Sequence, residues 1–133
     1  MDTVPFRCLA TPGFGEVDGV LQLSPDALSL QFQLHDAVLG VRRSEVHQRQ
    51  LSMNQIGSAD YVQSLFGLGA RIELVLTDSA PLAQFPRDSA AFNLRVPWSK
   101  RGLARRLVEE LKLYLRDQRY QKLQRDIDYL SKQ

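Results

Sequence analysis

The chain has 133 residues, of which 44% are hydrophobic and 24% are charged, a composition typical of one globular domain. No apolar stretch approaches the roughly 18 residues that a membrane-spanning helix needs, and the first residues lack the charged start and apolar run of a signal peptide, so we expect a cytoplasmic location. A single cysteine, Cys8, excludes an intramolecular disulfide.

Charge is distributed unevenly along the chain. Residues 1–97 contain 7 Lys and Arg against 10 Asp and Glu, a net charge of −3, whereas residues 98–133 contain 10 against 5, a net charge of +5. One interpretation of a basic segment beside a mildly acidic body is an anionic partner. The alternative is that these long side chains only solvate an exposed helix face.

Alternation of apolar and polar residues predicts strands in the first 97 residues. The pattern is clearest over residues 28–34, and the short strand 20–23 precedes it across a tight turn at Ser24-Pro25-Asp26. The other expected strands are residues 45–53, 61–66, 71–76, 82–85 and 91–96. Residues 35–44 are expected to form a loop and residues 67–69 a turn.

Two of these strands are expected to be irregular. The apolar residues of 45–53 change parity between Val46 and Leu51, which predicts an edge strand with a β-bulge. Pro86 restricts residues 82–85 to an edge strand or a loop.

A single amphipathic helix is expected from Ser99 to the end of the chain. Pro97 ends the last strand, Ser99 is the expected N-cap, and Trp98 and Leu103 occupy the positions of a hydrophobic staple. One apolar stripe with helical spacing is expected to pack on the sheet: Leu103, Leu107, Val108, Leu111, Tyr114 and Leu115.

The stripe weakens after Leu115, where Tyr120 is the next apolar residue, and it resumes as Leu123, Ile127 and Leu130. An unbroken helix from Ser99 would reach about 50 Å, against an expected radius of gyration of about 14 Å. The last turns should therefore project, fold back or pair with another chain. These patterns predict an α+β, mainly β fold, in which about seven strands form a bent sandwich or barrel that one long C-terminal helix closes. They divide the chain into a β domain with its capping helix, residues 1–117, and a helical extension, residues 118–133.

Signatures of chemistry are absent. His35 and His47 have no Cys, Glu or His at metal-ligand spacing, and the glycines between residues 13 and 19 do not match the dinucleotide-binding spacing. We therefore expect no catalytic residues, no metal and no cofactor. Nucleic acid is a poor fit, because the strands lack interleaved aromatic residues for base stacking.

The order of elements resembles that of a pleckstrin-homology-like or GRAM-like domain, including the small bacterial versions. The resemblance is carried by the opening hairpin of residues 19–30, by residues 92–97 and by Ala104, Leu107 and Leu111 of the capping helix. It implies two nearly orthogonal sheets with the helix closing one open end. Family members bind phosphoinositides, peptides or each other. Lipid-binding members use basic residues in the opening hairpin loop, whereas this chain has the short, acidic Ser24-Pro25-Asp26.

The resulting hypothesis is a non-enzymatic module that binds a protein partner or a second copy of itself. The expected contact residues are Tyr120, Leu123, Ile127 and Leu130 of the tail. The alternative is peripheral binding to an anionic lipid or phosphoinositide. Six basic residues are the candidates for that patch: Arg42, Arg43, Lys100, Arg101, Arg105 and Arg106.

Overall fold

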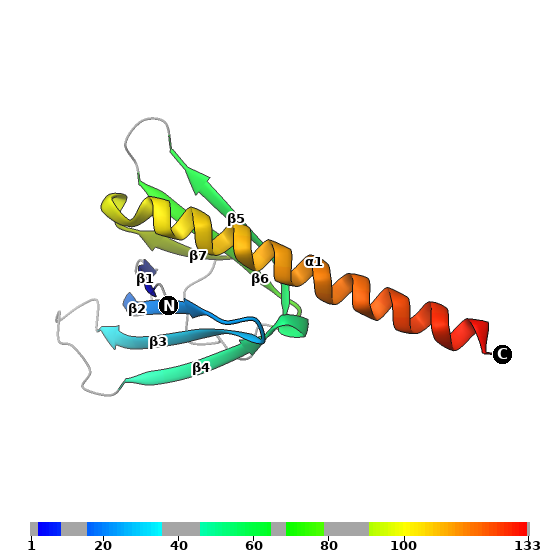
Figure 1. The fold of residues 1–133 in the computed structure, drawn as a ribbon. Coiled ribbons are helices and arrows are strands. Elements are labelled where there is room, and N and C mark those ends of the chain that lie inside the picture. The colour runs from blue at the N-terminus through cyan, green and yellow to red at the C-terminus, as the bar shows by residue number, and fades with distance from the viewer. Residues whose placement is uncertain (1–2, 9–15, 36–45, 65–68, 79–90, 133) are drawn as a thin grey trace.

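The structure, a computed structural model, describes residues 3–8, 16–35, 46–64, 69–78 and 91–132. Seven strands lie within these residues: β1 (Thr3–Cys8), β2 (Glu16–Leu23), β3 (Ala27–His35), β4 (His47–Ser52), β5 (Ile56–Gln63), β6 (Ala70–Leu76) and β7 (Ala91–Val96). The short 3-10 helix η1 (Met53–Gln55) joins β4 to β5, and a second, η3 (Trp98–Lys100), leads into α1 (Arg101–Ser131). The fold is α+β and mainly β, as predicted (Figure 1).

The strands form one antiparallel sheet in the order β4-β3-β2-β1-β7-β6-β5. Two meanders, β1–β4 and β5–β7, meet where β1 pairs with β7, at Arg7 and Arg95. In Figure 1, β2, β3 and β4 lie on one side of this junction, and β5, β6 and β7 lie on the other, beside α1. Hydrogen bonding thus joins the two halves into one continuous sheet.

One hydrophobic core unites the halves of the sheet and the helix. Each half contributes the inward residues of its strands, such as Leu30 and Phe32 of β3 and Leu74 of β6, which are at most 1% exposed. The helix contributes Ala104, Leu107, Val108, Leu111 and Leu115. The stripe predicted to pack on the sheet therefore does so, with Leu103 and Tyr114 partly buried at its margin.

Three polar contacts hold α1 against η1 and β5. Lys112 Nζ lies 3.0 Å from Asp60 Oδ1, Gln118 Nε2 donates to Asn54 Oδ1 at 2.6 Å, and Arg119 donates to the Gly57 carbonyl oxygen at 2.5 Å. The chain beyond Arg119 leaves the body.

The hairpin of β2 and β3 agrees with the prediction. Its strands pair without interruption from Glu16–His35 to Leu23–Leu28, and Ser24 Oγ donates to the Ala27 carbonyl oxygen at 3.0 Å across the turn. The strands predicted at residues 71–76 and 91–96 correspond to β6 and β7. The prediction for residues 82–85 and most of the predicted 35–44 loop lie outside the described residues.

The bulge predicted in residues 45–53 is wrong. The pairing of β4 with β3 is continuous from His47 to Ser52, and Val46, which suggested a change of parity, lies before the strand and is 56% exposed. The irregularity instead lies in β5, between Ile56 and Ser58. It places Ile56 and Ala59 in the core although they are three residues apart, and it hides the alternation that would have marked the start of β5.

Strand β1 lies outside the predicted strands. Val4, Phe6 and Cys8 are buried in alternation, but Pro5 interrupts the pattern, and proline is uncommon in the middle of a sheet. Pro5 pairs with Val20 of β2 and lies outside the short pairing with β7 at Arg7.

The predicted N-cap at Ser99 is also wrong. Residues Trp98–Lys100 form the turn η3, in which the Lys100 N–H donates to the Pro97 carbonyl oxygen at 2.8 Å, and α1 starts at Arg101 after an N-cap at Lys100 that makes no side-chain bond. With the N-cap at Lys100, the N′ position of a hydrophobic staple falls on Ser99 and not on Trp98. The Arg101 guanidinium lies over the Trp98 ring, 4.3 Å from its centroid.

Candidate interaction surface

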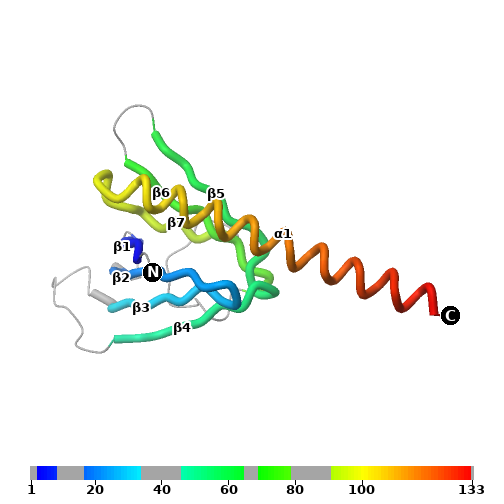
Figure 2. The backbone as a smooth tube through the Cα atoms, viewed as in Figure 1, coloured from blue at the N-terminus to red at the C-terminus, as the bar shows by residue number. Residues whose placement is uncertain are grey.

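Helix α1 extends well past the sheet. Its 31 residues correspond to about 46 Å at a rise of about 1.5 Å per residue. Figure 2 shows its last turns projecting from the body, and every described residue from Arg119 onward is exposed. The tail therefore does not fold back on its own body.

The exposed part of α1 has an apolar face of its own. Five large hydrophobic side chains between 49% and 67% exposed make up this surface, which we call the outer row: Leu113, Tyr120, Leu123, Ile127 and Leu130. At about 100° per residue, the outer row lies roughly 150° around the helix from the buried stripe. The helix thus has two apolar faces on nearly opposite sides.

The outer row has heptad spacing. Counting Leu113 as position a, the a positions continue at Tyr120 and Ile127, and Leu123 and Leu130 occupy d. Arg116 occupies the remaining d position within the row. The row ends toward the N-terminus because the preceding a and d positions are Arg106 and Glu109, both exposed.

All four tail residues proposed from the sequence lie together on this row. The interpretation that they resume the buried stripe is wrong, because the side of the helix that continues that stripe carries Gln118, Lys122 and Arg125. Leu113 was missed, although its spacing of seven from Tyr120 marks it as a member of the row. Tyr129 is 67% exposed but lies on the side of the buried stripe, apart from the outer row.

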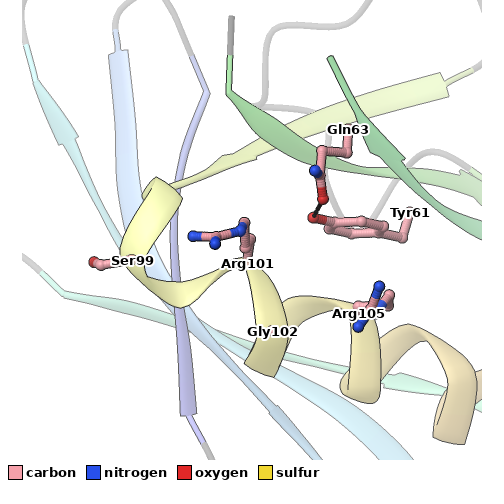
Figure 3. A pocket seen from close by; sticks show the side chains of 6 residues that line it. All are labelled: Tyr61, Gln63, Ser99, Arg101, Gly102 and Arg105. Carbon is pink, nitrogen blue, oxygen red and sulfur yellow. Dashed lines mark hydrogen bonds between the residues drawn. The ribbon is translucent and has the colours of Figure 1, made fainter. Parts of the chain in front are cut away.

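A second candidate surface is a hollow of about 310 Å³ at the start of α1. Its lining residues come from β5, η3 and α1: Tyr61, Gln63, Ser99, Arg101, Gly102 and Arg105. Figure 3 shows Arg101 and Arg105 along one side of it, and the Tyr61 hydroxyl donating to Gln63 Oε1 at 2.8 Å on the other. Arg101 also donates to the Trp98 carbonyl oxygen at 2.8 Å.

The six basic residues proposed from the sequence do not all meet at this hollow. Arg101 and Arg105 line it, whereas Lys100 and Arg106 do not, since consecutive helical residues point about 100° apart. Arg42 and Arg43 lie outside the described residues. The structure therefore brings two of the six arginines and lysines to one cavity.

Within the described residues, no group of three or more His, Cys, Asp and Glu could hold a metal ion. His47 is half-buried and stacks on Phe32 with ring centroids 5.4 Å apart. Burial raises the pKa of the Cys8 thiol to about 12, with a smaller contribution from the charge of Asp18. Such a thiol is protonated near neutral pH and is a poor nucleophile.

None of the helices described has the length and apolar character needed to cross a bilayer. Comparison with known proteins found no family model, no curated protein and no solved structure that matches this chain.

Proposed function

We propose that this chain is a non-enzymatic, pleckstrin-homology-like interaction module that binds protein through the outer row of α1. The observation that carries the proposal is the row itself, five large apolar side chains about half to two-thirds exposed on a helix that leaves the body. Laying an amphipathic helix against a partner is an established mode of recognition. The family assignment and a cytoplasmic location are part of the proposal and rest on the sequence patterns given above.

The outer row is unlike the scattered hydrophobic residues of an ordinary surface. Single exposed hydrophobic side chains are normal, whereas contiguous ones mark interaction sites. Here they recur at heptad spacing over residues 113–130, a length of about 27 Å. The residues beside the row carry both signs of charge, with Lys112 and Arg119 against Asp117 and Asp126, as is usual at the margins of a helix–helix contact.

Affinity capture from a cell extract with the full chain and two variants tests the proposal. Leu123→Glu places a charge in the outer row, and Tyr129→Glu makes a matched change on the other side of the same exposed turns. We expect Leu123→Glu to lose the captured proteins and Tyr129→Glu to retain them. Equal capture by both variants and the original chain would contradict the proposal. Far-UV circular dichroism checks that the helix is intact in each variant.

A second candidate function is binding of an anionic lipid headgroup, which the pairing of Arg101 and Arg105 at the hollow favours. Co-sedimentation with anionic and neutral vesicles, at low and near-physiological salt, separates it from protein binding. Electrostatic binding should require anionic vesicles and weaken steeply with salt. It should also fall in the double variant Arg101→Gln/Arg105→Gln. Absence of binding at low salt would eliminate this function.

A further inference from the structure

We propose that the occupant of the outer row is a second copy of this chain, paired antiparallel so that Leu113 of one copy lies opposite Leu130 of the other. This inference rests on the proposed protein-binding role of the row and names its partner. It follows from where the apolar row starts and ends and from the charges beside it.

The antiparallel arrangement uses the whole row. The row begins at Leu113 and ends at Leu130, so a two-fold axis midway between them, near residues 121 and 122, matches each end with the other. Position a then meets position d in every layer of the seam. Leu113 lies opposite the partner's Leu130, and Tyr120 lies opposite the partner's Leu123. Each of these layers occurs twice in the symmetric pair.

The third layer explains how a charged residue fits in the seam. Arg116 lies opposite the partner's Ile127 in this register. An arginine can run its methylene groups along an apolar side chain and keep its guanidinium in water. A parallel pair would instead place Arg116 against its own copy in the same layer, with two like charges in the seam.

The flanking charges favour the same register. In an antiparallel pair the g positions of the two helices face each other. Arg119 and Asp126 occupy g positions. With Leu113 opposite Leu130, Arg119 faces the partner's Asp126, and this ion pair occurs twice. A register shifted by one heptad, with Tyr120 opposite the partner's Leu130, would leave Leu113 unpaired and bring Asp126 against its own copy.

The body of the protein leaves room for this pair. The outer row is roughly 150° from the stripe that packs on the sheet, so the tip of the partner helix passes along the solvent side of α1. Lys112 contacts Asp60 and Arg119 contacts Gly57, and both of these partners belong to β5, on the side of α1 that faces the body. Arg119 has five N–H donors and can bond the Gly57 carbonyl and a carboxylate together. A seam of fewer than three heptads predicts a reversible, concentration-dependent dimer.

Sedimentation equilibrium of the full chain over a wide concentration range tests the inference. We expect a monomer–dimer equilibrium that Leu123→Glu abolishes and Tyr129→Glu leaves unchanged. Arg119→Asp and Asp126→Arg should each raise the dimer Kd about tenfold, and the double variant Arg119→Asp/Asp126→Arg should restore it. Lys122→Asp, an equal charge reversal off the row, should have little effect. A dimer Kd of the double variant as high as that of the single variants would overturn the register.

Cysteine cross-linking tests the orientation. A mixture of the Leu113→Cys and Leu130→Cys variants should form the mixed disulfide, whereas each variant alone should form little. Abundant homotypic disulfides would overturn the antiparallel arrangement. Native Cys8 is 1% exposed and does not compete.

The two proposals can fail separately. A wild-type chain that is monomeric at every concentration overturns the self-pairing. If Leu123→Glu then still loses captured proteins that Tyr129→Glu retains, the outer row remains a protein-binding surface for a different partner. If neither variant changes capture, both proposals fail.

Discussion

Gly19 shows at the scale of one residue how closely the central strands approach. It faces Phe32 across the β2–β3 pair. A Cβ added there would lie 2.8 Å from Phe32 Cβ and 2.9 Å from its Cα, and closer still to the Gln31 carbonyl oxygen. Because two of these three atoms belong to the backbone, the strands would have to move apart.

We therefore predict that Gly19→Ala lowers the free energy of unfolding by about 1–3 kcal/mol, as other overpacking changes do. The measurement is urea denaturation followed by circular dichroism. Gly102→Ala is the matched control, because nothing lies within 4 Å of the position its Cβ would take. Alanine favours a helix over glycine by up to about 1 kcal/mol, so this variant should be as stable or slightly more stable. Similar losses at both positions would refute this account of Gly19.

At the scale of one element, α1 carries one apolar face for the core and another for solvent. Leu111 is fully buried, whereas Leu113, two residues later, is 53% exposed. We predict that Leu111→Ala lowers the free energy of unfolding by about 2–5 kcal/mol, because it leaves a cavity between helix and sheet. Leu113→Ala should cost less than about 1 kcal/mol at concentrations where the chain is monomeric.

Chemical denaturation of the two alanine variants at low protein concentration provides this comparison. An equal loss of stability would mean that α1 is rotated from the orientation described here. A loss at Leu113 that grows with protein concentration would instead measure the self-pairing.

Other elements show where local patterns mislead. Met53 lies two residues after Leu51, the spacing expected on one face of a continuing strand. It belongs instead to η1, where Gln55 Oε1 accepts from the Ser52 N–H at 2.9 Å. Ser99 has the chemistry of an N-cap, yet Pro97 and Lys100 close a tighter turn first. In both cases the backbone adopts one turn of 3-10 helix, which alternation and capping preferences do not distinguish from a strand end or a helix start.

At the scale of the whole molecule, the tail is separate from the folded body. We predict that a chain ending at Arg119 unfolds at the same urea concentration as the full chain when both are dilute, because residues 120–132 are exposed. The same truncation should abolish the concentration-dependent dimer in sedimentation. A truncated chain that unfolds at clearly lower urea concentration would indicate that the tail contributes to the core.

The sequence by itself determined the main features of the architecture. Alternation over residues 28–34 and the Ser24-Pro25-Asp26 turn predicted the β2–β3 hairpin, and helical spacing from Leu107 to Leu115 predicted the face that packs on the sheet. These features are local, since each depends on residues a few positions apart, and local periodicity reports them directly. The same periodicity singled out Tyr120, Leu123, Ile127 and Leu130.

Only the tertiary structure decided how those pieces are used. Pairing of β1 with β7 makes one sheet from two meanders, and it joins residues almost 90 positions apart. The rotation of α1 against β5 determines that Leu111 is buried and Leu113 is exposed, and it shows that the tail row is a second face instead of a continuation of the first. Which side of a helix meets the sheet depends on contacts between distant segments, and no local pattern contains that information.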